Sequence, residues 1–426
     1  MLQEIILQQK KEKEQTLLKD FIKREKITGF KKNLSSDLIK VITGPRRAGK
    51  SVFSFLLLED ANFAYLNFDD EKLLDVTDTD EIIKSLVEVY GKTKYIFFDE
   101  IQNLKNWELF VNKLQRRGYN LVLTGSNAKL LSKELSTSLT GRYISVEIFP
   151  FSFREFLTAK KVSVAKKEFN LPEIKGEILN YLSEYNLHGG FPEVTLKNFE
   201  PKQYLNTLYE AILLKDIVKR YNVRFTQKMY DLSVYTASNF CQELSYTKLK
   251  NILGFNSTHT AQNYLSYLSE AYISFTLNRY SNKVKEQINA SKKIYLIDNG
   301  FIEAKAFQSS KNYGKLIENL IFIELLNRGC KLNMNLFYYK TRNQKEVDFV
   351  LKKGIKIKEL IQVSYDVKDP YTEKREINSL LEASEELNCK NLSIITWDTE
   401  KKVTVKKTKI SFIPLWKWLL DNTLFC

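Results

Sequence analysis

The chain has 426 residues, a formal net charge of +15 and a hydrophobic fraction of 43%. This length is too great for one ordinary core, and the composition is that of a soluble globular protein with several domains. No apolar run approaches the roughly 20 residues needed to cross a bilayer. The N-terminus, MLQEIILQQKKEKEQ, has charges where a secretory signal has an apolar stretch. We therefore expect a cytoplasmic protein without a membrane partner.

Residues 1–35 are expected to form an N-terminal helical segment, and residues 36–155 an α/β domain. Apolar runs predict strands at Leu38–Thr43, 62–70, 92–100, 119–127 and 142–149. A helix that carries Val52, Phe53, Leu56 and Leu57 follows the first strand, and helical patterns at 81–91, 106–118 and 128–139 separate the later ones. Strands that alternate with helices predict a parallel sheet with helices on both faces.

The segment GPRRAGKS fits the phosphate-binding pattern G-x-x-x-x-G-K-[ST] at every position, after a strand and before a helix. Its glycines let the backbone turn tightly near the phosphates, and the loop amides and helix N-terminus face the anion. Lys50 is expected to meet the β- and γ-phosphates of ATP, and the Ser51 hydroxyl to coordinate Mg²⁺. The predicted nucleotide-binding residues are Gly44, Pro45, Arg46, Arg47, Ala48, Gly49, Lys50, Ser51 and Val52.

The strand YIFFDE delivers two carboxylates at its C-terminal end, where α/β sheets place their sites. Asp99 is expected to bind the metal, directly or through its waters, and Glu100 to polarise the attacking water as general base. Two solvated turn carboxylates are the alternative.

Two further positions are predicted to serve ATP hydrolysis. The fourth strand ends in TGSN and is expected beside the Asp99 strand, where Ser126 or Asn127 could hold the attacking water or sense the γ-phosphate. Arg142 could reach the ATP of a neighbouring subunit in a homo-oligomer and stabilise transition-state charge. An ordinary turn and a surface or structural arginine are the respective alternatives.

Residues 156–225 are predicted to form a helical lid, and residues 226–300 a winged helix–turn–helix, because two helical patterns precede short strand-like segments. Between Lys215 and Tyr295 the chain has 12 Lys or Arg and 5 Asp or Glu. This excess favours a polyanionic partner, DNA first, although a solvated lysine-rich face is the alternative. The predicted nucleic-acid contacts are His259, Gln262 and Asn263 in the second helix and Arg279, Lys283 and Lys285 in the wing.

Residues 301–426 form a second predicted α/β unit. A helix, GKLIENLIFIELLNRG, precedes strands at 336–341, 346–354 and 358–366, then a helix at 372–387, a strand at 391–397 and one C-terminal strand.

The chain resembles the AAA+ ATPases of bacteria and archaea that carry a C-terminal domain of unknown function. The resemblance rests on GPRRAGKS, FFDEIQN, LTGSNAKLLSKELSTSLTGR, FPFSFREFL, HGGFPEV, IYLIDNGF, GKLIENLIFIELLNRG and EVDFVL, and spans about residues 35–400. It implies an AAA+ fold, ATP hydrolysis, a winged helix and a terminal domain similar to PD-(D/E)XK nucleases. Arg46 and Arg47 match the family's P-loop pattern.

The nuclease resemblance implies a helix Glu, a strand Asp and a (D/E)-x-K on the next strand. Glu318 and Asp348 fit the first two, whereas Gln362 and Ser364 stand where Glu and Lys are expected. A neutral amide is a poor Mg²⁺ ligand and a serine supplies no ammonium, so we expect a degenerate domain unless Lys358 or Lys340 substitutes.

We therefore expect an ATPase that couples Mg²⁺-dependent ATP hydrolysis to DNA binding. The alternatives are an ATP-regulated, metal-dependent nuclease and a nucleotide-dependent switch that binds only protein partners.

Overall fold

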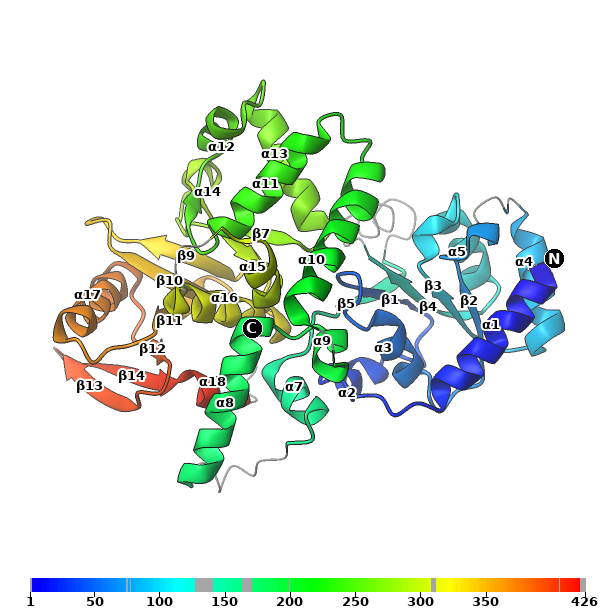
Figure 1. Cartoon of the computed structure of the whole chain (residues 1–426), viewed down its shortest axis with the longest axis horizontal. Helices are drawn as coiled ribbons and strands as arrows, with labels where there is room; N and C mark the ends of the chain where they lie inside the picture. Colours follow the sequence, from blue (N-terminus) through cyan, green and yellow to red (C-terminus); the bar gives the residue numbers. More distant parts are fainter. Residues whose placement is uncertain are drawn as a thin grey trace. The chain divides into compact units, whose positions relative to one another are not determined.

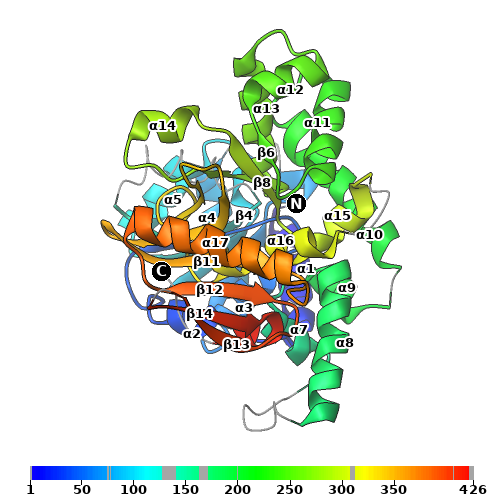
Figure 2. The same cartoon turned by 90° about the vertical axis from the view of Figure 1, so that its left-hand side faces the viewer.

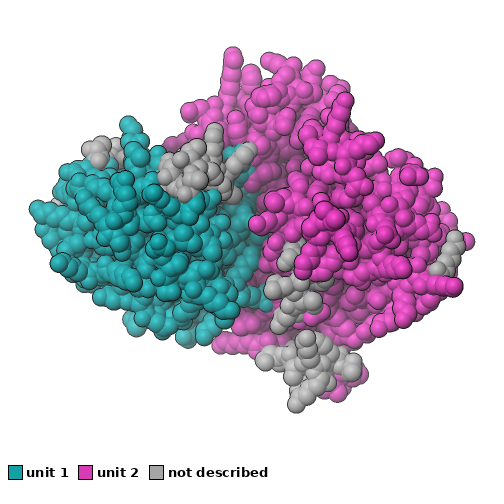
Figure 3. All heavy atoms as spheres, turned by 180° about the vertical axis from the view of Figure 1, so that it is seen from behind, with its two compact units in different colours: residues 1–151, 270–272 teal, residues 152–269, 273–426 magenta. Residues whose placement is uncertain are grey.

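The computed structural model describes residues 2–73, 76, 78–126, 141–162, 171–198, 200–307, 312–405 and 407–421. The chain divides into two compact units, drawn in different colours in Figure 3. The first unit comprises residues 1–151 and 270–272, and the second comprises residues 152–269 and 273–426.

The first unit is built on a parallel sheet (Figure 1). Its strands are β1 (Ile39–Thr43), β2 (Phe63–Asn67), β3 (Tyr95–Asp99), β4 (Asn120–Gly125) and β5 (Tyr143–Glu147). They lie in the order β2-β3-β4-β1-β5, and every neighbouring pair is parallel. The predicted parallel sheet is confirmed, and so is the place of the fourth strand beside the Asp99 strand.

Helices cover both faces of this sheet because its strands are apolar on both sides. In β2, Ala64 and Leu66 join the core cluster of α1 (Leu2–Leu17), α4 (Thr79–Tyr90) and α5 (Trp107–Arg116). Phe63 and Tyr65 join the opposite cluster, with α2 (Ile27–Lys31) and α3 (Lys50–Leu57). Short 3₁₀ turns span Glu71–Leu73 and Ile101–Asn103. The helix predicted at 128–139 lies outside the described residues.

The second unit begins with helices. They are α7 (Phe153–Ala159), α8 (Pro172–His188), α9 (Pro192–Leu196), α10 (Pro201–Ala211), a π-helical stretch (Ile212–Lys219) and α11 (Thr226–Ser238). Ser152 and Glu155 start α7 with a reciprocal capping box, and proline occupies the first turn of α8, α9 and α10.

A small antiparallel sheet follows. Its strands are β6 (Glu243–Leu244), β7 (Ser274–Asn278) and β8 (Lys292–Leu296), in the order β6-β8-β7. The associated helices are α12 (Tyr246–Leu253), α13 (Thr258–Glu270) and α14 (Val284–Asn289). The element order predicted from the sequence, two helices followed by two strands, is present.

The C-terminal part of the unit is a six-stranded sheet, seen with α17 across it in Figure 2. The strands β9 (Leu336–Lys340), β10 (Glu346–Lys353), β11 (Lys356–Ser364), β12 (Leu392–Thr396), β13 (Lys401–Val405) and β14 (Thr408–Pro414) lie in the order β13-β14-β12-β11-β10-β9. The helices are α15 (Asn299–Lys305), α16 (Tyr313–Asn327), α17 (Pro370–Leu387) and α18 (Leu415–Leu420). The single predicted C-terminal strand is wrong in detail, since β13 and β14 form an antiparallel pair.

Candidate functional sites

The predicted phosphate-binding loop joins the end of β1 to the start of α3. Gly44 has φ +147°, and a Cβ atom there would lie 2.0 Å from the carbonyl oxygen of Ile148. Gly49 caps α3 with φ +90° in the left-handed region. Both positions therefore require glycine, one for close approach and one for conformation. The first turn of α3 directly follows this loop, and the free N–H groups at a helix N-terminus favour an anion.

A buried arginine outside the motif fixes this loop. Arg24 donates from Nη1 to the carbonyl oxygen of Ala48 (2.8 Å) and from Nη2 to that of Phe149 (2.6 Å). Its guanidinium also lies 5.1 Å from the ring centroid of Phe151. The sequence analysis missed Arg24, because the charged run around it gives no signal that one member is buried.

Among the described residues, the ammonium of Lys50 has one hydrogen bond and one longer ion pair. Its Nζ lies 3.2 Å from the carbonyl oxygen of Pro45 and 3.6 Å from Oε1 of Glu100. The side chain is 4% exposed. A buried ammonium whose carboxylate partner lies 3.6 Å away is suited to bind an incoming anion.

Asp99 lies at the end of β3 and is buried. It accepts hydrogen bonds from the Thr124 hydroxyl and, at 3.4 Å, from Tyr65 Oη. Burial, and next the neighbouring Glu100 carboxylate, raise the pKa of Asp99 to about 6, whereas hydrogen bonds from Thr124 and Ser51 oppose the rise. The Ser51 hydroxyl and the Asp99 carboxylate are thus neighbours, as two ligands of one Mg²⁺ would be.

Glu100 has a left-handed backbone, with φ +49°. A non-glycine residue in this region costs about 1–3 kcal/mol and persists where the surroundings hold it. Its N–H donates to Thr124 Oγ1 (3.0 Å), and its Oε2 accepts from Gln102 Nε2 (2.5 Å). The Thr124 hydroxyl therefore contacts both residues of the pair, Asp99 through its carboxylate and Glu100 through its backbone. The sequence analysis missed it, although it lies in the quoted TGSN segment.

Three other residues of this region, Ser126, Asn127 and Arg142, were predicted to serve ATP hydrolysis. Ser126 is buried at the end of β4, and its Oγ has no hydrogen-bond partner among the described residues. Asn127 lies outside the described residues. Arg142 is exposed and donates to Asn112 Oδ1 at 3.2 Å. Taken together, the glycine turn, the buried ammonium, the paired acid and hydroxyl, and a Ser126 hydroxyl that is unsatisfied among the described residues fit ATP with Mg²⁺.

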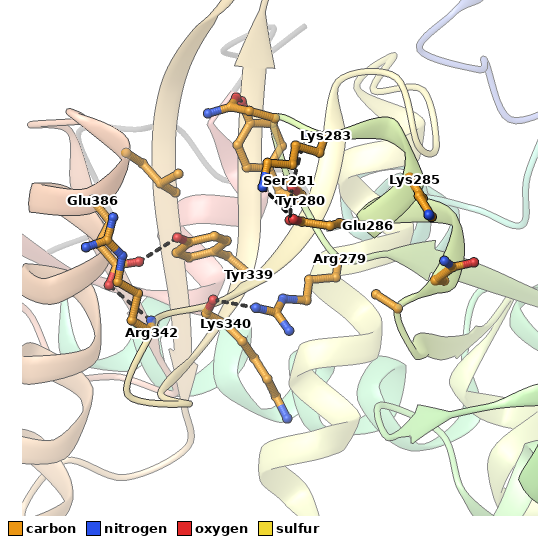
Figure 4. A pocket seen from close by; sticks show the side chains of 14 residues that line it. Arg279, Tyr280, Ser281, Lys283, Lys285, Glu286, Tyr339, Lys340, Arg342 and Glu386 are labelled. Carbon is orange, nitrogen blue, oxygen red and sulfur yellow. Dashed lines mark hydrogen bonds and ion pairs between the residues drawn. The ribbon is translucent and has the colours of Figure 1, made fainter.

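A second site is a pocket of about 730 Å³ in the second unit, shown in Figure 4. We call it the basic pocket, because five cationic side chains line it against two acidic ones. The cations are Arg279, Lys283, Lys285, Lys340 and Arg342, and the acids are Glu286 and Glu386. The pocket thus gathers the three predicted wing residues and adds two from β9 and the turn after it.

Some of these charges have partners within the chain. Lys283 pairs with Glu286 at 3.1 Å, and Lys340 pairs with Glu243 at 2.8 Å. The Arg279 guanidinium donates to the carbonyl oxygen of Lys340 (3.3 Å). Among the described residues, the side chains of Lys285 and Arg342 have no ion-pair partner. The pocket therefore has cations left to meet an anion.

The three predicted residues of α13 do not line this pocket. His259 and Gln262 are exposed, whereas Asn263 is half-buried and hydrogen-bonded to His259 Nδ1 (3.3 Å).

At a third site, Glu318 and Asp348 of the predicted nuclease remnant both contact Lys293, a lysine that was not predicted from the sequence. Nζ of Lys293, from β8, contacts Glu318 (2.7 Å), Glu346 (2.7 Å) and Asp348 (3.0 Å). Gln362 joins the site at its edge, where its Oε1 accepts from the Asp348 N–H (3.4 Å). Lys340, one of the two lysines suggested from the sequence, pairs with Glu243 instead. The available signal was a charged pair, Lys292–Lys293, at the start of a buried apolar strand.

The segments HGGFPEV and IDNGF meet in a buried junction. Asp298 accepts hydrogen bonds from the N–H groups of Gly190 and Gly300, both at 2.8 Å. A Cβ on Gly189 would lie 1.7 Å from Oδ1 of Asp298. Burial raises the pKa of Asp298 to about 7. This junction joins α8 to α15 and explains these motifs by packing.

The chain matches known protein families and relatives along most of its length. A family model described as "AAA domain" matches residues 36–157. Two models described as domains of unknown function, DUF8612 and DUF4143, match residues 179–312 and 313–418. The protein MJ1544 of Methanocaldococcus jannaschii is 41% identical over 399 residues, which cover 90% of this chain and 88% of that protein. The chain belongs to this family of AAA-domain proteins.

The chain is also similar to other proteins. A Haemophilus influenzae protein is 32% identical over 351 residues, covering 78% of this chain and 84% of its own. The Walker-type ATPase PABY2304 of Pyrococcus abyssi aligns with a TM-score of 0.42 at 13% identity, covering 67% of this chain and 96% of that one. Within the described residues, no helix is both long and apolar enough to cross a membrane. The match to the AAA-domain model identifies residues 36–157 as a P-loop, ATP-binding type of domain.

Proposed function

We propose that this AAA-domain protein hydrolyses ATP with Mg²⁺ at the loop Gly44–Ser51. The observation that carries the proposal is the arrangement at the ends of β1, β3 and β4. There the buried Lys50 ammonium lies 3.6 Å from the Glu100 carboxylate, and Asp99 and Ser51 are neighbours.

Each residue has a role that its position supports. Lys50 and the loop amides bind the phosphates, with Arg46 and Arg47 at the turn of the same loop. Ser51 and Asp99 hold Mg²⁺, which supplies charge stabilisation to the transferring phosphoryl group. Glu100 orients and deprotonates the attacking water, and Thr124 holds Glu100 through its backbone. The buried Ser126 hydroxyl, unsatisfied among the described residues, is available to the nucleotide or to that water.

The experiment for this proposal is steady-state ATP turnover with Mg²⁺ in the wild type and in Lys50→Ala. Wild-type turnover that disappears in the variant supports it. Equal turnover in both proteins contradicts the assignment of the site.

We propose further that the nucleotide cycle is coupled to nucleic acid, DNA in particular, at the basic pocket. The five cations of the pocket, with Lys285 and Arg342 lacking ion-pair partners among the described residues, favour a phosphate backbone. The element order from α11 to β8 supports a winged helix here, with Arg279, Lys283 and Lys285 between its last two strands. His259 and Gln262, exposed in α13, are then available to base edges.

Binding of a fluorescent DNA duplex across a salt series tests this second proposal. In the double variant Lys285→Gln/Arg342→Gln, we expect weaker binding and a salt slope smaller by about 0.9 per removed cation. The matched control is Lys353→Gln/Lys356→Gln, which removes two exposed lysines at the β10–β11 turn, outside the pocket. Equal losses in both double variants would mean that the pocket has no special role.

The same DNA distinguishes the partner classes when it is added to the ATPase assay. Stimulation of a Lys50-dependent rate supports coupling to nucleic acid. Unstimulated hydrolysis, with no binding of any oligonucleotide, would favour a switch that binds a protein partner. Mg²⁺-dependent DNA cleavage that disappears in Asp348→Ala would favour the nuclease alternative.

A further inference from the structure

Lys293 stands where three carboxylates converge. It comes from β8, whereas Glu318 comes from α16 and Glu346 and Asp348 come from β10. The three N–O distances are 2.7, 2.7 and 3.0 Å. The lysine side chain is 2% exposed, and those of Glu318 and Asp348 are 11% and 9% exposed. A single ammonium thus holds acidic groups from a helix and from a strand of another sheet.

The cluster has the chemistry of a hard-metal site but not the room for one. Convergent carboxylate oxygens are what Mg²⁺ and Mn²⁺ bind in proteins. Here the point of convergence holds a fixed positive charge, and a second cation beside it would be repelled. In the present arrangement, no group of three or more His, Cys, Asp or Glu among the described residues could hold a metal ion. The residues therefore do not fit a metal in this chain.

We propose that Lys293 is the built-in cation of this cluster, in place of a divalent metal, and that it joins β8 to α16 and β10. The cluster is then a structural junction and not a catalytic centre.

Further hydrogen bonds hold the acids of the cluster and the residues next to them. Tyr295 Oη donates to Glu318 Oε1 (2.7 Å), and the Val363 N–H donates to Asp348 Oδ2 (2.9 Å). Gln362 Nε2 donates to Glu376 Oε2 (2.8 Å), and Ser364 Oγ donates to the carbonyl oxygen of Asp366 (3.2 Å).

Electrostatics explain why a cation is required here. Burial raises the pKa of Glu318 to about 7 and also raises the pKa of Asp348, so both acids are costly to ionise inside the protein. Burial acts against the charged form of Lys293 as well, but the surrounding acids outweigh it and its pKa lies well above the usual value. Removal of the ammonium would leave buried acids without a counter-ion.

The mechanical consequence follows from the strand pairing. β8 pairs with both β6 and β7 in the small sheet, whereas β10 lies between β9 and β11 in the six-stranded sheet. Lys293 therefore ties the small sheet to the C-terminal sheet at a buried point. Asn319 of α16 reinforces the tie by bonding both the N–H and the carbonyl oxygen of Leu296.

The test compares thermal unfolding of chelator-treated, nucleotide-free protein with and without Mn²⁺. For Lys293→Met we expect Tm to fall by roughly 10 °C, and Mn²⁺ to restore a large part of the loss because the carboxylates can then close on it. The matched control is Lys292→Met. Lys292 is also buried in β8, but its Nζ contacts the carbonyl oxygens of Gln287 (2.6 Å) and Ile288 (2.9 Å) and, in the part of the chain that the structure describes, no carboxylate. Its Tm should not respond to Mn²⁺ beyond the wild-type response.

Further variants make the outcome decisive. In Lys293→Met/Asp348→Asn, the Mn²⁺ rescue should be lost. An unchanged Tm in Lys293→Met, or a loss that Mn²⁺ does not restore, would overturn the proposal. If Lys293→Met cannot be purified, the Tm response to Mn²⁺ is compared between the wild type and Asp348→Asn. Equal Mn²⁺ responses in the two support a built-in cation, and a wild-type stabilisation that Asp348→Asn abolishes contradicts it.

Discussion

Lys50 and Lys293 are both buried lysines beside carboxylates, and they differ in how far their charge is already compensated. Lys50 Nζ lies 3.6 Å from one carboxylate and 3.2 Å from the carbonyl oxygen of Pro45. Lys293 Nζ lies within 2.7–3.0 Å of three carboxylates. The first lysine can gain by binding an anion, whereas the second can only lose by exchanging its partners. The two lysines are similarly buried, and what distinguishes the proposed ligand-binding lysine from the proposed structural one is the number of carboxylates around the ammonium and their distance from it.

Glu100→Gln should produce the largest effect that distinguishes the two carboxylate sites. We expect ATP turnover to fall by roughly 10²–10⁴-fold, because a general base is lost, while a fluorescent ATP analogue still binds. The matched variant is Glu318→Gln, which changes a buried glutamate at the other lysine and should leave turnover within a few-fold of wild type. Unchanged hydrolysis in Glu100→Gln would remove Glu100 from this role.

Thr124→Val should produce a smaller effect on the same assay. The substitution keeps the shape of the side chain but removes its hydrogen bonds to the Asp99 carboxylate and the Glu100 N–H. We expect turnover to fall by about tenfold, equivalent to about 1.4 kcal/mol of barrier. Thr396→Val is the control, since this threonine is also buried but bonds to Thr399 in the C-terminal sheet. Similar losses in both variants would point to a general effect of core hydroxyls.

The smallest expected effect is the dependence of stability on pH that Asp298 causes. This carboxyl is buried like Asp99 and Asp348, but no lysine among the described residues contributes to the shift of its pKa. Its partners are two backbone N–H groups, and burial raises its pKa to about 7. Between pH about 4 and about 7 the folded protein keeps a proton that the unfolded chain releases. The free energy of unfolding should therefore fall as pH rises through this window, and this contribution should level off above it.

The measurement is Tm as a function of pH in the wild type and in Asp298→Asn. The variant should have a flatter decline from pH about 5 to about 7, even if it is less stable throughout. Asp369→Asn is the control, because the pKa of this helix-capping carboxyl is lowered and it stays ionised across that window. A decline that is as steep in Asp298→Asn as in the wild type would mean that another group titrates.

The sequence predicted those features that depend on residues close together along the chain. The parallel sheet, the P-loop and the Asp99–Glu100 pair were predicted from apolar runs and motif spacing. In the structure the P-loop follows β1, and the acidic pair lies at the end of β3. Residues that act across the fold were missed. Arg24 reaches the loop from 24 positions before Ala48, Thr124 bonds to Asp99 from 25 positions away, and Lys293 is 55 positions from Asp348. These distances reflect packing, which periodicity and composition do not encode.

The predicted nuclease remnant illustrates the same limit. The sequence indicated that Gln362 and Ser364 replace expected groups, and therefore that the domain is degenerate. It could not indicate which cation compensates the remaining acids, because Lys293 belongs to a strand of a different sheet. A lysine at the start of the buried strand β8 was the one local sign.

The most direct test of the central claim is Mg²⁺-dependent ATP turnover in the wild type, Lys50→Met and Lys293→Met, each assayed well below its own Tm. We predict that Lys50→Met lowers turnover by at least about 100-fold with little change in Tm, because its ammonium serves the nucleotide. Lys293→Met should keep turnover within a few-fold while losing thermal stability. Full turnover in Lys50→Met, or equal losses of turnover in both variants, would contradict the distinction between the two lysines.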